Sequence, residues 1–559
     1  MKKHFVLPLL SAAVIIAGCG KAPEPSLSQN TGGHQSTAQV EFQAEQLSRH
    51  IQQLASDAFL GRQPGTEGET LTVDYLVQQF QQLGLQAGND GSFTQAVPYM
   101  QVTNIGQPQV RLTGSANGWQ PQVGTDIVVS SRTGQTEVNL SASDIMFAGY
   151  GVVAPEYQWH DFAALDAKGK TVIVLVNDPG FASKDPALFK GEEMTYYGRW
   201  TYKYEECARQ QAAACLIVHD TAAAGYGFNV VQNMMQRAQF DLANNQSAKT
   251  PVIGWLSTEG AEQLFASAGL DFQALKTRAA QPGFQAVALE GHQLSASIKL
   301  DVQTGSSNNV LAALPGKSRA DEWLVLTAHW DHLGAIPKED GALAIYNGAI
   351  DNAGGVAALL AIAEQAVAQG GFERSVLFLV ITLEESGLLG TKHYVANPTV
   401  PLAQIVANIN IDALLPVPET RDIWIIGLGQ SELDDVVRSQ AAKQQRVVIG
   451  NPEVEKGFFY RSDQFAFAQV GIPGLFMGPG TDSLQGGKAV GEAALQATQA
   501  RYHTPDDIFT PDWDFGALLQ DTQLHYLVLE ALANSGQWPN WSTQSEFYQL
   551  GQQLRQTRQ

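Results

Sequence analysis

The amino-acid sequence predicts an α/β protein in which a mostly parallel central sheet is flanked by helices. From about residue 305 onward, strand-length apolar runs alternate with segments of helical periodicity, as expected of a parallel sheet with helices on both faces. Several runs are apolar along their whole length, as buried strands are. The chain has 559 residues, and since single cores stop growing near about 250–300 residues, it should hold more than one domain.

The N-terminus carries a targeting segment. Two lysines precede the apolar run 5–16, which is too short for a membrane-spanning helix of about 20 residues, and small residues then lead to Cys19. Residues 1–18 resemble a bacterial lipoprotein signal peptide with Cys19 as the lipidated residue; an ordinary secretory signal is the alternative. The polar segment 19–38 should be a flexible tether. We expect an exported outer-membrane lipoprotein, facing the periplasm or the cell surface, that contacts the membrane only through its lipid anchor.

Residues 39–104 are expected to begin with two helices that belong to the α/β domain described below. Apolar residues recur at helical spacing in two stretches, namely Leu47, Ile51 and Leu54, and then Val73, Leu76, Phe80 and Leu83. A loop rich in glycine, 60–66, separates the two helices.

Short strands with glycine and proline between them characterise residues 105–290. The expected elements are strands at 144–151, 170–176, 215–218 and 251–254 and a helix at 203–214. They contain no group of candidate ligands, so we interpret the segment as an inserted β-rich domain without a catalytic or metal-binding site. Cys207 falls on the helix and Cys215 on the strand after it. We favour two free buried cysteines over a disulfide, because spacing alone does not specify the required geometry.

Residues 291–540 are expected to hold the central sheet and its helices. The predicted strands are 323–328, 376–383, 405–411 and 469–477, and the predicted helices are 354–368 and 515–533. Residues 541–559 read as a polar C-terminal tail.

Five candidate metal ligands lie in this last domain. They occur in the contexts AHWDHLG, AIDNAGG, TLEESG, NINID and RYHTPDD, and are His329, Asp351, Glu385, Asp412 and His503. Imidazole and carboxylate groups bind divalent cations, and zinc accepts both. Five ligands are one too many for a closed tetrahedral site but suit two Zn²⁺ ions that share a bridging carboxylate. The set therefore predicts a hydrolase.

The positions of these ligands strengthen the prediction. His329, Glu385 and Asp412 each follow a predicted strand, and sites in open parallel sheets form outside the carboxyl ends of the strands. Each residue alone has a simpler interpretation, such as helix capping for Asp351. Convergence of separate strand ends on one crevice favours the metal site.

Two neighbouring acids are assigned roles from chemistry. Adjacent residues leaving a strand point in opposite directions, so one residue of the Glu384–Glu385 pair can bind metal while the other faces a bound water. Asp331, two residues after His329, is placed to accept a hydrogen bond from that imidazole. Two zinc ions about 3.5–4 Å apart would acidify a shared water and polarise a carbonyl group.

The motifs HxD, DNAGG, EE, NxD and YHTPxD together resemble family 28 of the metallopeptidases, the di-zinc aminopeptidases of the aminopeptidase Y and bacterial leucyl aminopeptidase type. The stretch LGRQPGTEGE at 60–69 resembles a signature of the branch with an inserted protease-associated domain, and FAGYGVVAP at 147–155 resembles that insert. The resemblance covers roughly residues 45–535. It implies a zinc-exopeptidase (phosphorylase/hydrolase-like) fold and removal of N-terminal residues from peptides.

Carried over residue by residue, the resemblance implies one ligand shared by two metal ions and a further pair of ligands for each ion. Asp351 would bridge two zinc ions. His329 and Asp412 would complete one site, and Glu385 and His503 would complete the other.

The resemblance also implies roles around the metals. Glu384 would be the general base, and Asp331 the partner of a ligand imidazole. Tyr460 lies near where some members carry a tyrosine that stabilises an oxyanion; a rim aromatic is the alternative. The stretch 462–464 resembles an SDH motif, but Gln464 replaces the histidine, which puts a role for that position in doubt.

Charge and motif content limit other functions. The formal net charge of −21, from 34 basic and 55 acidic residues, argues against nucleic acid, and peptides are the expected partners. A carboxypeptidase or deacylase of the related co-catalytic zinc class shares HxD and EE, but YHTPxD and the insert disfavour it. A glutaminyl cyclase-like enzyme uses a single zinc, and a non-enzymatic receptor-like member would not need all five ligands and the base.

Overall fold

The computed structural model describes residues 41–115, 118–338 and 340–558. The predicted signal peptide, the tether and Cys19 lie outside the described residues. The elements below belong to one compact unit, Phe42–Gln559. Within the described ranges, none of the helices combines the length and apolarity that crossing a membrane requires.

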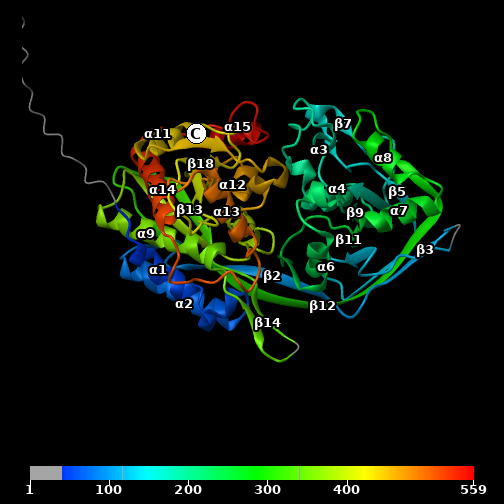
Figure 1. Cartoon of the computed structure of the whole chain (residues 1–559), viewed down its shortest axis with the longest axis horizontal. Coiled ribbons are helices and arrows are strands. Elements are labelled where there is room, and N and C mark those ends of the chain that lie inside the picture. Colours follow the sequence, from blue (N-terminus) through cyan, green and yellow to red (C-terminus); the bar gives the residue numbers. More distant parts are fainter. Residues whose placement is uncertain (1–40, 116–117, 339, 559) are drawn as a thin grey trace, which may run out of the picture. The chain divides into compact units, whose positions relative to one another are not determined.

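A mostly parallel sheet forms the centre of this unit and confirms the predicted fold class (Figure 1). Its strands, in spatial order, are β19 (Val447–Gly450), β18 (Asp422–Ile425), β20 (Gly474–Gly478), β17 (Ile405–Asn410), β13 (Arg319–His329), β16 (Arg374–Ile381) and β12 (Val287–Leu314). β16, β13, β17 and β20 run parallel to one another, whereas β12 pairs antiparallel with β16 and β18 pairs antiparallel with β20. Every residue of β16 and β17 is buried, which explains their continuous apolar character.

Helices pack against this sheet as the periodicity predicts. The helices of this region are α1 (Ala44–Leu54), α2 (Glu67–Gln82), α9 (Gly355–Ala368), α10 (Leu389–Ala396), α11 (Leu433–Lys443), α12 (Gln464–Gln469), α13 (Lys488–Gln499), α14 (Gly516–Asn534) and α15 (Tyr548–Gln556). α9 is buried along most of its length because it packs on β13 and β16 and also contacts α1 and α14. α9 is apolar around most of its circumference because other elements pack against several of its sides.

A buried arginine connects the N-terminal helices to the loops around the strand ends. Arg62, at the end of η1 (Asp57–Arg62), is 1% exposed. Its guanidinium donates hydrogen bonds of 2.5–2.9 Å to the backbone carbonyls of Leu54, Trp330, Asn347 and Gly348. A planar guanidinium can satisfy several carbonyls at once, so Arg62 compensates four backbone acceptors from three separate stretches of the sequence.

The chain leaves the central sheet for the insert, and returns to the sheet after it, through two paired strands. β2 (Thr94–Asn104) ends where the insert begins, and β12 returns from it, pairing with β2 from Leu300↔Asn104 to Val310↔Thr94. The first half of β12 also pairs with strands of the insert, so one continuous strand runs across the predicted boundary at residue 290 (Figure 1). The resemblance of the insert to a protease-associated domain stays a prediction.

Strands and helices alternate inside the insert. Its sheet contains β5 (Glu137–Phe147), β8 (Thr171–Leu175), β9 (Ala214–Val218), β11 (Val252–Leu256) and β4 (Ile127–Ser130), of which the first four are parallel to one another. Its helices are α3 (Pro179–Ser183), α4 (Trp200–Arg209), α5 (Thr221–Ala224), α6 (Phe228–Gln236), α7 (Thr258–Ser267) and α8 (Phe272–Ala279). The insert has its own apolar clusters on both faces of this sheet.

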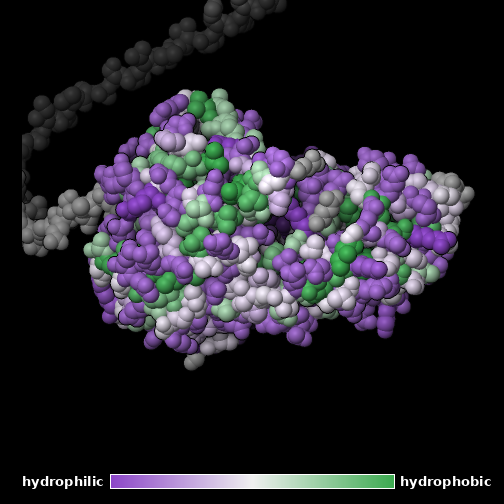
Figure 2. All heavy atoms as spheres, turned by 90° about the horizontal axis from the view of Figure 1, so that it is seen from below, coloured by the Kyte–Doolittle hydropathy of each residue, from purple (hydrophilic) through white to green (hydrophobic). Residues whose placement is uncertain are grey.

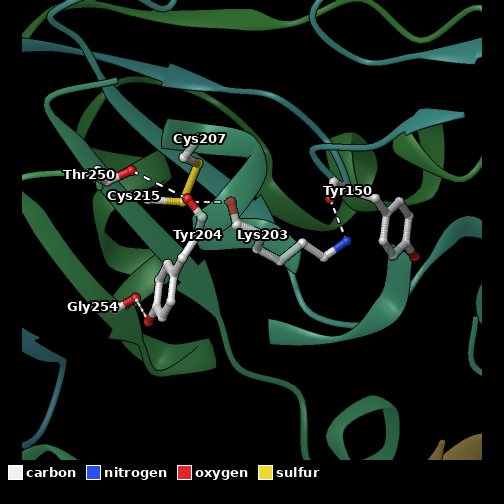
Figure 3. Close-up of a disulfide and its surroundings, with 7 residues drawn as sticks. All are labelled: Tyr150, Lys203, Tyr204, Cys207, Cys215, Thr250 and Gly254. Carbon is white, nitrogen blue, oxygen red and sulfur yellow. Dashed lines mark hydrogen bonds between the residues drawn. A yellow bond between two sulfur atoms is a disulfide. The ribbon is translucent and has the colours of Figure 1, made fainter. Parts of the chain in front are cut away.

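The two cysteines of the insert form a disulfide (Figure 3). Cys207 near the end of α4 and Cys215 on β9 have Cα atoms 6.1 Å apart, and both are buried. The expectation of two free cysteines is therefore wrong. The chain turns from α4 directly into β9, so the last turn of the helix lies over the start of the strand. On the same helix, Lys203 is buried and donates from Nζ to the carbonyl of Tyr150 at 2.6 Å.

The segment predicted as a polar tail packs against the central domain. Trp541 and Phe547 are buried, and the Trp541 indole donates to the carbonyl of Gly471 at 3.0 Å. Although most of this segment is polar, these two aromatic residues are buried and attach it to the central domain. On the face shown in Figure 2, hydrophilic residues cover most of the surface and hydrophobic residues occur in small groups.

Candidate metal centre

Three of the five predicted ligands lie at one edge of the central sheet. His329 is the last residue of β13, while Glu385 and Asp412 follow the neighbouring strands β16 and β17. β13 lies between β16 and β17 and runs parallel to both. Their carboxyl ends therefore bring the three side chains together, as the pattern of strand ends predicts.

The first group of potential ligands contains His329, Asp351 and Asp412. The Nε2 atom of His329 is 3.2 Å from Oδ1 of Asp351 and 3.3 Å from Oδ1 of Asp412. One ligand atom from each of the three residues lies within 4.8 Å of the others. The group can hold a metal ion.

The second group shares Asp351 with the first. The Nε2 atom of His503 is 3.2 Å from Oδ2 of Asp351 and 3.0 Å from Oε2 of Glu385. The two oxygens of Asp351 therefore contact different imidazoles, Oδ1 that of His329 and Oδ2 that of His503.

A sixth potential ligand, His332, was not among the sequence candidates. Its Nδ1 is 2.7 Å from Oε1 of Glu385, and it forms with Asp351 and Glu385 a further group whose ligand atoms lie within 4.8 Å of one another. Its Nε2 is buried and has no hydrogen-bond partner among the described residues. The signal was its place three residues after His329, in the same loop beyond the strand end.

Asp507 shapes the backbone that carries Asp351. Its carboxylate accepts hydrogen bonds from the backbone N–H groups of Ile350, at 3.0 and 3.2 Å, and of Asp351, at 3.1 Å. Asp351 lies in the turn Ala349–Gly354 before α9, and its peptide bond to Asn352 is cis. The YHTPDD segment thus supplies both His503 and the acid that orients the Asp351 turn.

The glutamate pair divides between the two groups. The Oε2 atom of Glu384 is 3.9 Å from Nε2 of His329, whereas Glu385 contacts His503 and His332. Asp331 holds the backbone of the pair, because its carboxylate accepts hydrogen bonds from the N–H groups of Glu384 at 3.0 Å and Glu385 at 3.4 Å. This agrees with the opposite directions expected of adjacent residues.

Asp331 also orients the first imidazole, through its backbone. The backbone carbonyl of Asp331 is 3.1 Å from Nδ1 of His329, while its carboxylate Oδ1 is 3.9 Å away. A carbonyl only accepts, so this hydrogen bond requires a proton on Nδ1 and makes Nε2, which faces Asp351 and Asp412, the nitrogen that can bind a metal. The expected carboxylate–imidazole contact is thus replaced by a carbonyl–imidazole contact at closer range.

The electrostatics of the cluster show a surplus of buried negative charge. Burial alone would lower the pKa of His329, but the charges of Glu384 and Asp412 raise it well above its usual value. The pKa of His503 rises to about 10 against the effect of burial, chiefly because of Glu385. Burial raises the pKa of Glu384 well above its usual value, and the charge of Asp412 adds to this rise. Imidazole and carboxylate donors around such charge fit a divalent cation.

Tyr460 lies in a different environment from these ligands. It is buried among aromatic rings, with centroids 5.3 Å from Phe465 and 6.1 Å from Tyr196 of the insert. Burial, followed by the charge of Glu546, raises the pKa of its phenol well above the usual value. Its contacts within the described part of the chain do not include the five predicted ligands, and its role at an oxyanion stays a prediction.

The 462–464 stretch reaches the cluster through Ser462. The Ser462 hydroxyl donates to Oδ2 of Asp412 at 2.5 Å and accepts from the Asn410 side-chain amide at 2.6 Å. Gln464 is fully buried and accepts from the same amide at 3.1 Å. Gln464 therefore supports Asn410 without touching a ligand, whereas Ser462 is a contact of Asp412 that sequence reasoning missed.

Residues 309–527 match the model of peptidase family M28. The chain is a peptide hydrolase. The matched segment includes all five predicted ligands, His332 and Glu384, and it lies outside the insert. A comparison with curated proteins found no match.

Solved structures similar to this peptide hydrolase include an aminopeptidase from Aneurinibacillus sp. strain AM-1, with 17% identity and a TM-score of 0.51 over 89% of this chain and 95% of that chain. A zinc aminopeptidase from Bacillus subtilis has 20% identity and a TM-score of 0.44, over 88% and 96%. A peptidase M28 precursor from Shewanella amazonensis SB2B has 17% identity and a TM-score of 0.42, over 88% and 96%. The first of these likenesses shows the fold.

Proposed function

We propose that the protein is a zinc-dependent aminopeptidase that removes N-terminal residues from peptides with two metal ions. The observation that carries this proposal is the position of Asp351, whose two carboxylate oxygens contact two different imidazoles, His329 and His503. A carboxylate between two donor groups is suited to bridge a pair of ions. The match to a peptidase family supports peptides as substrates, and the likeness to the Aneurinibacillus aminopeptidase supports the N-terminal direction of attack.

The two groups would divide the metals between them. His329 and Asp412 would complete one site, and Glu385 and His503 the other, with Asp351 in common. Bound there, the ions supply Lewis acidity and a water acidic enough to attack at neutral pH. Imidazole and carboxylate donors without a thiolate are typical of catalytic zinc sites.

Glu384 is proposed to move the proton. Its carboxylate, 9% exposed and 3.9 Å from the first imidazole, would accept a proton from the attacking water and deliver it to the leaving amine. Asp331 would position both this base and the imidazole of His329, because its carboxylate holds the Glu384 N–H and its carbonyl accepts from Nδ1.

Activity should depend on metal and on a free amino terminus. We expect the purified protein to hydrolyse aminoacyl p-nitroanilides, to lose at least about 100-fold in rate after chelation and dialysis, and to recover when Zn²⁺ is restored, because the ions supply both the nucleophile and the polarisation of the carbonyl. N-acetylated versions of the same substrates should not be cleaved. Turnover that survives chelation, or cleavage of blocked peptides alone, would contradict the proposal, and one metal per chain at full activity would contradict the two-ion centre.

We also propose export and lipid anchoring at Cys19, from the short apolar run and small residues that precede it. The full chain expressed in a Gram-negative host should be recovered in the outer-membrane fraction. Cys19→Ser should shift most of it to the soluble periplasmic fraction or to an unprocessed precursor. A serine variant that fractionates like the parent protein would exclude Cys19 as the anchor.

A further inference from the structure

The two carboxylate oxygens of Glu385 face two different imidazoles. Nδ1 of His332 is 2.7 Å from Oε1, whereas Nε2 of His503 is 3.0 Å from Oε2. The side chain of His332 is fully buried, and that of Glu385 is 9% exposed. A metal ion bound by Glu385 could therefore take a nitrogen from either ring.

The separations between potential ligand atoms distinguish the two imidazoles. Two atoms held about 2.0–2.1 Å from one zinc ion at a tetrahedral angle lie about 3.3 Å apart. The contacts of His329 and His503 with Asp351 are both 3.2 Å, and that of His503 with Glu385 is 3.0 Å. The 2.7 Å between His332 and Glu385 is shorter and matches a charge-assisted N–H···O hydrogen bond of about 2.7–2.9 Å. His332 also belongs to a group whose ligand atoms lie within 4.8 Å of one another, but that spacing includes atoms beside an ion as well as atoms bound to it.

The hydrogen bond fixes the tautomer of the His332 imidazole. An ionised carboxylate only accepts, so the Nδ1 atom that faces Glu385 carries the proton. The other ring nitrogen, Nε2, is buried and finds no hydrogen-bond partner in the described part of the chain. Among these residues, Glu385 is thus the group that the His332 ring orients by a hydrogen bond.

Contacts that involve no metal ligand hold the imidazole in place. The backbone N–H of His332 donates to the carbonyl of Arg62 at 3.3 Å, and the Arg62 guanidinium donates to the carbonyl of Gly348 at 2.9 Å. Gly348 lies directly against the ring, because a Cβ atom there would be 2.7 Å from Cγ and Cδ2 of His332. Glycine is therefore required at this close approach. Arg62 and Gly348 together fix the ring at Glu385.

The first group of ligands contains a corresponding arrangement. Oδ1 of Asp412 is 3.3 Å from Nε2 of His329, and Oδ2 accepts a hydrogen bond from the Ser462 hydroxyl at 2.5 Å. Each of the two groups thus has one carboxylate with one oxygen facing a ligand imidazole and the other held by a protein donor. Asp351 differs, because both of its oxygens face ligand imidazoles.

We propose that His332 is a positioning residue that donates from Nδ1 to Oε1 of Glu385 and leaves only Oε2 for the metal ion. The proposal rests on the two-ion centre proposed above. A carboxylate with both oxygens free can take two coordination positions on one ion, whereas a carboxylate held by a donor takes one. Catalytic zinc sites keep one position open for water or substrate. With Asp351, His503 and a single oxygen of Glu385 as ligands, the second ion keeps such a position.

The test uses two replacements of His332 that differ in the donor. The side-chain nitrogen of asparagine is as many bonds from Cβ as Nδ1 is, so His332→Asn keeps a donor for Glu385, whereas His332→Leu removes it. Zinc is titrated against a chromophoric chelator to resolve two dissociation constants, and Glu385→Gln identifies the step that belongs to the second ion. We expect His332→Leu to weaken that step by about 10–100-fold, the usual effect of removing a partner of a metal ligand, and His332→Asn to stay within about threefold of the wild type.

The control and the contrary outcomes are equally defined. His160→Leu, at an exposed position of the insert, should change neither dissociation constant. If His332→Asn weakens the step as much as His332→Leu does, the imidazole nitrogen itself binds the ion and the proposal is wrong. Wild-type affinities in His332→Leu, or an equal loss in both steps, also overturn it, and a wild type with a single zinc site overturns it together with the two-ion centre.

A crystal structure of the zinc-loaded wild type provides a second measurement, which decides the matter even if His332→Leu does not fold. Nδ1 of His332 should lie about 2.7–2.9 Å from Oε1 of Glu385, and a distance of about 2.0–2.1 Å from Nδ1 to zinc would overturn the proposal. Neither measurement requires turnover. A failure of the aminopeptidase function therefore appears in the hydrolysis rates, and a failure of the proposal in the zinc affinities and distances.

Discussion

Replacing Glu384 with glutamine should abolish turnover while leaving the metal in place. Glutamine keeps the size of the side chain but cannot accept the proton of the attacking water, so kcat should fall by about 10²–10⁴-fold, the usual contribution of a general base. Glu384 is 9% exposed and lies 3.9 Å from His329, on the side of the glutamate pair away from His503. Aminoacyl p-nitroanilide hydrolysis measures the loss, and elemental analysis measures the metal content.

Glu492→Gln is the matched control for this variant. Glu492 is exposed on α13, and the same chemical change there should alter neither kcat nor metal content. If Glu384→Gln keeps wild-type turnover, the base must be another residue. If it loses metal along with activity, Glu384 is a ligand, and the division of the pair between base and ligand is wrong.

Replacing Asp351 with asparagine should remove both metals and with them the activity. Each oxygen of Asp351 contacts a different imidazole, so both sites lose a charged ligand at once. We expect activity to fall by at least about 100-fold, since even residues that only support a metal ligand are worth about 10–100-fold. A readout that does not require turnover is thermal stability. Zn²⁺ at 100 times its dissociation constant should stabilise the wild type by about 2.7 kcal/mol.

The asparagine variant should show no such stabilisation by Zn²⁺. Asp435→Asn serves as the control, because the Asp435 side chain is 84% exposed and lies outside the cluster. Retention of one metal per chain in Asp351→Asn would show that the two groups bind independently. Unchanged metal content would contradict the shared-ligand arrangement.

Much of the candidate site can be predicted from local sequence because parallel strands impose their own geometry. His329 ends β13, and Glu385 and Asp412 follow β16 and β17. Once these apolar runs are assigned to one parallel sheet, their carboxyl ends must lie at one edge. The alternation of directions along a strand likewise predicts the division of the glutamate pair.

Other contacts of the site depend on tertiary packing. His332 comes within 2.7 Å of Glu385 only because the chain after β13 turns back over the strand ends. Asp507 reaches the N–H groups of the Asp351 turn from more than 150 residues away in sequence. The role of the Asp331 carbonyl was equally hidden, because every residue has one and only geometry shows which carbonyl meets an imidazole.

By itself, the sequence determined the fold class of the catalytic domain and the choice of candidate ligand residues, since periodicity and strand-end position are local properties. Only the tertiary structure decided the disulfide between Cys207 and Cys215 and the continuous strand β12 that joins the insert to the central sheet. Each of these depends on how separate elements meet in space. The distances between separate elements follow from the packing of the whole chain, so residue type and local spacing alone do not predict them.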